Sequence, residues 1–183
     1  MTSPAHSVAF ALALALVPQM TLAQSDPHMH GANGHDEVNM PGLRGRDATV
    51  QESAEMEVMF KNFPTLSREV ENLPDGIRTV TRSSDPDVMD ALVSHVVGMT
   101  ARVDEGRDPE VIIQSPTLDI FFERTGAIET EIEVTEEGIV VVQTSDDPEI
   151  VAALHTHAAE VSDMAARGMV SVHERMMGPA NGG

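Results

Sequence analysis

One stretch of the chain is repeated at a fixed interval, and this internal duplication constrains the fold more than any other feature. Residues 76–86 read GIRTVTRSSDP, and residues 138–148 read GIVVVQTSDDP, 62 positions later. The same interval continues without a gap through four further matches: Ala91 and Ala153, Leu92 and Leu154, His95 and His157, and Gly106 and Gly168. Two copies of one pattern predict two equivalent structural units related by an approximate twofold axis.

Each copy has the pattern of a strand followed by a helix. The strand is rich in β-branched residues and runs into an aspartate, Asp85 or Asp147, that can cap a helix. Proline follows the aspartate closely in both copies and suits the first helical position, where its missing N–H costs nothing. Gly106 and Gly168 indicate where the two helices end. We therefore expect two long helices of similar length.

The second copy contains an additional strand. Residues 128–135 and 139–144 have strand character and flank a turn at Glu136-Glu137-Gly138, which predicts a β-hairpin. An upstream Pro-Thr-Leu occurs at residues 64–66 and again at residues 116–118, an interval of 52. The second copy therefore has about ten residues more between this motif and its last strand.

The segment before the first copy is predicted to be helical. Thr49 and Glu52 have the spacing of a capping box. Apolar residues then recur at helical intervals: Met59, Phe63, Leu66, Val70 and Leu73. Pro64 interrupts this series, which predicts either two helices or one kinked helix.

These elements predict an α+β fold, with a small, mostly antiparallel sheet covered by two long helices. A ferredoxin-like arrangement is the nearest common architecture, although only three strands are clear; a mainly α bundle with a β-hairpin is the alternative. We expect a single domain over residues 48–177, with repeat units at 64–106 and 116–168. Residues 24–47 and 178–183 lack apolar periodicity and are predicted to be disordered.

The first 23 residues have the features of a secretory signal peptide. An apolar run over residues 8–17 is ended by Pro18, and Thr21-Leu22-Ala23 supplies small residues at a cleavage site near Ala23. We therefore expect an exported, periplasmic protein. No later stretch is long and apolar enough to predict a membrane span. The chain has no cysteine, which excludes disulfides, thiolate metal sites and covalent c-type haem.

The formal net charge of −19 limits the classes of partner. Such a surface repels nucleic acid and anionic lipid, and it attracts cations and basic proteins. The sequence shows no nucleophile elbow, no H-E-x-x-H zinc motif and no phosphate-binding glycine loop. These observations favour a binding protein over an enzyme, and no catalytic residue is predicted.

Two histidines at equivalent places in the duplication are the strongest candidates for function. His95 lies on the apolar stripe of the first long helix, three residues after Leu92 and four before Met99. His157 occupies the matching place in the second helix, three residues after Leu154. Under an approximate twofold relation, the two imidazoles can face each other across the helix interface.

These residue types suit copper. Imidazole and thioether are ligands of copper, and His95 and Met99 lie one turn apart on one helix face. Adding His157 from the other helix makes a two-histidine, one-methionine set suited to Cu(I). His28 and His30, in the histidine- and methionine-containing tail, are candidates for a metal-capturing arm. The position that matches Met99 is Val161, so the duplication preserves the histidines but not the methionine.

Two alternatives remain open at this point. His95 and His157 are also candidates to bind a b-type haem without a covalent link, one from each side of the iron. In the second alternative, the chain is a cofactor-free interaction module with a periplasmic protein partner. Each histidine is then a neutral core residue hydrogen-bonded to the main chain.

Overall fold

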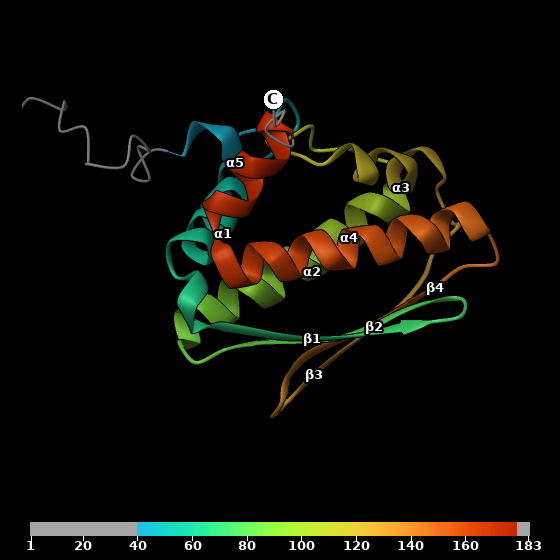
Figure 1. The fold of residues 1–183 in the computed structure, drawn as a ribbon, viewed down its shortest axis with the longest axis horizontal. Coiled ribbons are helices and arrows are strands. Elements are labelled where there is room, and N and C mark those ends of the chain that lie inside the picture. Colours follow the sequence, from blue (N-terminus) through green and yellow to red (C-terminus); the bar gives the residue numbers. More distant parts are fainter. Residues whose placement is uncertain (1–39, 179–183) are drawn as a thin grey trace, which may run out of the picture. The chain divides into compact units, whose positions relative to one another are not determined.

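A four-stranded antiparallel sheet lies under a layer of helices in the computed structural model, which describes residues 40–178 (Figure 1). This arrangement confirms the predicted α+β class. The predicted signal peptide, the tail up to residue 39 with His28 and His30, and the chain after residue 178 lie outside the described residues.

The sheet consists of two hairpins joined along their inner strands. The strands are β1 (Leu66–Leu73), β2 (Gly76–Ser83), β3 (Glu129–Thr135) and β4 (Gly138–Thr144). Their order in the sheet is β1-β2-β4-β3, and all neighbours are antiparallel. The connection from β2 through a helix to β3 therefore skips one strand, as in the split β-α-β unit of ferredoxin-like folds.

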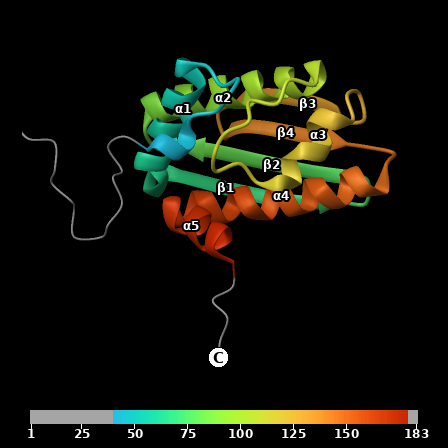
Figure 2. The same cartoon turned by 90° about the horizontal axis from the view of Figure 1, so that it is seen from above.

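Two long helices cover one face of the sheet. The helices of the described chain are α1 (Val50–Lys61), α2 (Pro86–Glu105), α3 (Asp119–Glu123), α4 (Pro148–Arg167) and α5 (Met169–Met177). Short 3-10 helices occupy Pro41–Leu43, Phe63–Thr65 and Pro116–Leu118. Figure 2 shows α2 and α4 running along opposite edges of this face, while the segment from α2 to α3 crosses from one helix toward the other.

The predicted caps begin both long helices. The Asp85 carboxylate accepts hydrogen bonds from the first-turn amides of α2, and Asp147 does the same for α4. Gly106 ends α2 in the left-handed conformation, with φ of 64°. Thr49 and Glu52 form the expected capping box at the start of α1.

The register of the sheet follows the duplication. Thr79 of β2 pairs with Val141 of β4, and these two residues are 62 positions apart. The pairing extends to both sides of this pair, from Gly76 opposite Thr144 to Thr81 opposite Ile139. An approximate twofold axis therefore passes through the Thr79–Val141 pair and relates the two strand–helix units.

One predicted helix is wrong: residues 66–73 form strand β1. Apolar residues four apart, such as Leu66 and Val70, share one face of a helix but also share one face of a strand. The turn residues Pro74-Asp75 that precede Gly76 favour a hairpin, and β1 pairs with β2 along its whole length. The first strand of each hairpin thus also belongs to the duplication.

The predicted disordered tail also ends earlier than expected. Residues 40–47 are packed against the domain: Leu43 is 1 % exposed, and Gly45 forms a bridge with Val111. The Ser53 hydroxyl of α1 donates a hydrogen bond to the Leu43 carbonyl. The glycine- and proline-rich composition was a misleading signal here, because tertiary contacts hold this segment.

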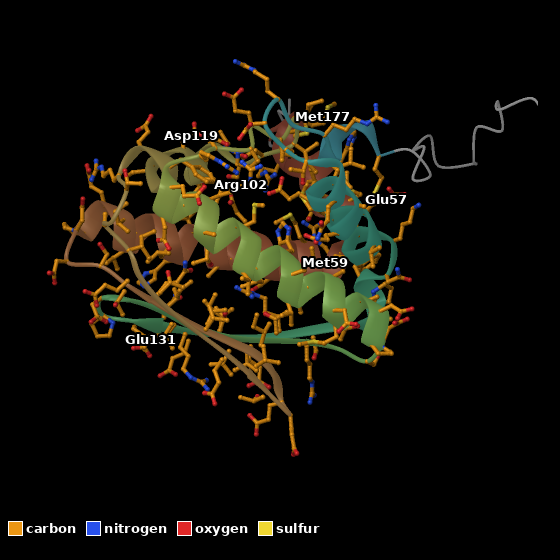
Figure 3. All side chains as sticks on the ribbon, turned by 180° about the vertical axis from the view of Figure 1, so that it is seen from behind. Glu57, Met59, Arg102, Asp119, Glu131 and Met177 are labelled. Atoms are coloured by element: carbon orange, nitrogen blue, oxygen red, sulfur yellow. The ribbon has the colours of Figure 1, made fainter. Side chains whose placement is uncertain are left out.

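Arg102, near the end of α2, fixes this N-terminal segment and α1 in place (Figure 3). Its guanidinium, 3 % exposed, donates from Nε and Nη2 to the Glu52 carboxylate over 2.5 and 2.9 Å. It also donates from Nη1 to the Asp47 carboxylate and the Arg107 carbonyl, and from Nη2 to the Asp47 carbonyl. All five of its N–H groups therefore have an acceptor.

Replacing Arg102 by methionine should lower the free energy of unfolding by about 3 kcal/mol, because it leaves a half-buried carboxylate without its partner. Urea unfolding of the variant measures the loss. The control is Arg107→Met, which removes an exposed guanidinium and should cost less than about 1 kcal/mol. Equal losses in the two variants would contradict the assignment.

The hydrogen bonds between Arg102 and Glu52 also predict that the free energy of unfolding falls in acid. These hydrogen bonds lower the pKa of Glu52 from 4.5 to about 2. A carboxylate with a lowered folded-state pKa stabilises the fold above pH 4.5, and this contribution is lost as the pH falls toward 2. Unfolding measured between pH 5 and pH 2 should therefore show a shallower pH dependence for Glu52→Gln than for the wild type. Parallel curves would rule this out.

Candidate functional site

His95 and His157 lie at matching places near the middle of α2 and α4. Each residue is partly exposed, but the Nδ1 atom of each ring is buried. The charge on His95 contributes to lowering the pKa of His157, which shows that the two rings are electrostatically coupled. Each of the two predicted side chains thus has one ring nitrogen enclosed by the domain.

Neither imidazole is tied to the main chain. The Nδ1 atoms of His95 and His157 have no hydrogen-bond partner among residues 40–178. His155, two residues from His157, behaves differently, because its Nε2 lies 3.1 Å from the Leu73 carbonyl and 2.8 Å from the Gly76 carbonyl. His155 therefore closes the β1–β2 hairpin, whereas the paired histidines keep a free ring nitrogen.

Arg68 is a third polar group in this region, and sequence reasoning missed it. It lies on β1 opposite Thr81, on the sheet face that the helices cover, and its Nη1 donates to the Thr81 hydroxyl over 2.6 Å. Its Nε is buried without a partner. In the described chain four buried side-chain polar atoms lack a partner, and Arg68, His95 and His157 supply three of them.

Both imidazoles are held in the neutral form. Burial is the main cause that lowers the pKa of His157 to about 4, and the charges of Arg68, His95 and Arg175 lower it further. Burial also lowers the pKa of His95, although the nearby carboxylates of Glu55 and Glu52 act in the opposite direction. At neutral pH each ring therefore retains one lone pair on nitrogen.

Apolar side chains also lie near the two histidines. The Phe121 and His157 rings form a T-shaped pair, with centroids 5.9 Å apart. One turn before His95, Leu92 belongs to a buried cluster with Ile139 and Val141. Met59 of α1 packs against that cluster, at the place labelled in Figure 3. The predicted ligand Met99 is partly buried one turn beyond His95 on α2. Two thioethers, one on α1 and one on α2, are therefore candidates to supplement the imidazoles.

The described residues limit the metals that the site suits. Among residues 40–178, no group of three or more His, Asp or Glu side chains has the arrangement of a metal site. The pair therefore offers two nitrogen ligands, which thioether sulfur can supplement. Within the same range, no helix combines the length and the apolar character needed to cross a membrane.

Comparisons of the chain with protein-family models, with curated proteins and with solved structures find no match.

The buried position of His157 predicts an unusual titration. Its ring should gain a proton near pH 4 rather than near pH 6.5, because burial and neighbouring arginines disfavour the charged form. Since the unfolded chain binds this proton more readily, the stability contributed by the neutral ring falls as the pH drops from 6.5 to 4. NMR titration of the imidazole carbon-bound protons, assigned with His157→Ala, measures the midpoint. A midpoint near 6.5 would contradict the burial of this ring.

Proposed function

We propose that the protein binds Cu(I) between α2 and α4, with His95 and His157 as nitrogen ligands. The observation that carries this proposal is the pair of buried, unbonded Nδ1 atoms at equivalent places in a duplicated fold. A buried polar atom without a hydrogen bond is unfavourable, so its retention in both halves calls for a ligand. Imidazole nitrogen is a common ligand of copper.

Low coordination and low charge favour Cu(I) over a divalent ion. A structural zinc site needs four ligands, whereas the described site offers two imidazoles and neighbouring thioethers. Soft sulfur from Met99 or Met59 supplements imidazole for Cu(I) better than for zinc. The positive charge of Arg68 near His157 also repels a divalent ion about twice as strongly as a monovalent one.

The proposed role is copper binding or trafficking in the periplasm. Two features support this role: the proposed copper site and the predicted signal peptide, which would direct the chain to an oxidising compartment. In this role, His28 and His30 of the tail capture the ion at low affinity before it reaches the paired histidines. Neutral imidazoles favour such a site, because the metal then displaces no proton from them at neutral pH.

Anaerobic titration of the full chain with Cu(I), in competition with a chromophoric chelator, tests the proposal. His95→Ala and His157→Ala should each weaken binding at least tenfold, because each variant removes one of the two nitrogen ligands. His155→Gln is the matched control and should keep the wild-type affinity, since that ring bonds to carbonyl groups.

A tail variant and a haemin titration separate copper binding at the paired histidines from the other possible ligand sites and ligands. A double variant, His28→Ala with His30→Ala, should retain the high-affinity site. Unchanged affinity in both His95→Ala and His157→Ala would overturn the proposal. If added haemin gives a Soret band that disappears in His157→Ala, the ligand is b-type haem instead of copper.

A further inference from the structure

Arg68 carries a partly buried positive charge without a carboxylate beside it. Burial alone lowers the pKa of Arg68 from 12.5 to about 10, and no acidic group contributes to the shift. Its only hydrogen bond joins Nη1 to the neutral hydroxyl of Thr81. The Nε–H group is buried and has no acceptor among residues 40–178.

Other arginines of the domain show how unusual this is. The buried guanidinium of Arg102 has an acceptor for all five N–H groups and faces two carboxylates. Arg124 and Arg167, which are more exposed, each pair with two acidic side chains. A charge that is withdrawn from water without a partner loses solvation free energy that no other interaction returns. For Arg68, by contrast, no carboxylate of the described chain balances the charge.

We propose that Arg68 forms a binding site for a small anion beneath α4, next to His157. The Nε–H group donates to the anion, and the Thr81 hydroxyl is a second donor because its oxygen already accepts from Nη1. Thr79 adds another buried hydroxyl two residues away on the same face of β2. A halide, a small oxyanion or the carboxylate of a small molecule has the charge and size for this position.

The anion site does not need a bound metal. If the proposed function holds, however, an anion at this site should also affect the affinity for copper. An anion at Arg68 neutralises the positive charge that opposes a cation near His157. Anion and Cu(I) should therefore bind with positive cooperativity, each raising the affinity of the other by the same factor.

Thermal unfolding of the metal-free full chain tests the anion site. The midpoint is measured against rising chloride, sulfate or acetate, with the ionic strength held constant by a bulky sulfonate salt. In the wild type, one of these anions should raise the midpoint saturably, by about 5–10 °C at 100 times its Kd. Arg68→Met should lose this rise, and it should fold because an apolar side chain of similar size replaces a buried charge.

Arg82→Met is the matched control. Arg82 lies on β2 with its Nε bonded to the Ser67 hydroxyl, and it is exposed, so this variant should respond as the wild type does. General salt effects act on all three proteins alike. The anion that saturates identifies the ligand class. Identical responses in wild type and Arg68→Met would overturn the inference.

A second test, an NMR titration, uses the wild type alone. The Nε–H signal of Arg68 in a proton–nitrogen NMR spectrum should shift saturably with the same anion, and the absence of such a shift with all three anions would overturn the inference. Failure here is distinct from failure of the copper proposal. His95→Ala should lose Cu(I) but keep the anion response, whereas Arg68→Met should lose the anion response but keep Cu(I).

Discussion

The antiparallel pairing of β2 with β4 is the interaction on which the rest of the structure depends. Thr79 faces Val141 at its centre, and the two residues occupy the same place in the two halves of the duplication. Because β2 and β4 run in opposite directions, α2 and α4 begin at opposite ends of the sheet and cover the same face. His95 and His157 therefore occupy equivalent places on two helices that cover the same sheet face, and the charge of one acts on the other although 62 residues separate them.

The duplication preserved the two imidazoles but not the charges around them. Carboxylates such as Glu55 act on His95, whereas the guanidinium groups of Arg68 and Arg175 act on His157. The space between the helices therefore has an acidic side and a basic side, with a neutral ring on each. The two proposed ligands fit this polarity. The carboxylate of Glu55 acts on the copper ligand His95, and the guanidinium of Arg68 lies at the proposed anion site.

Local spacing explains which parts of this structure could be predicted from sequence. The capping aspartates, the long helices and the inward histidines each depend on residues within a few turns, so the sequence pattern was enough. Strand β1 was missed because Leu66 and Val70 fit a helix as well as a strand, and Arg68 was missed with it. The Pro74-Asp75 turn was the available signal. The free Nδ1 atoms could not be predicted, since they depend on which acceptors other elements bring near.

X-ray absorption spectroscopy of the Cu(I)-loaded full chain tests the central claim most directly, because it identifies the ligand atoms. The account predicts two imidazole nitrogens in the first coordination shell of copper, with the outer-shell scattering of imidazole rings, and the loss of one of them in His157→Ala. A first shell of sulfur alone, or a spectrum that His157→Ala leaves unchanged, would contradict the assignment of the paired histidines as the ligand site.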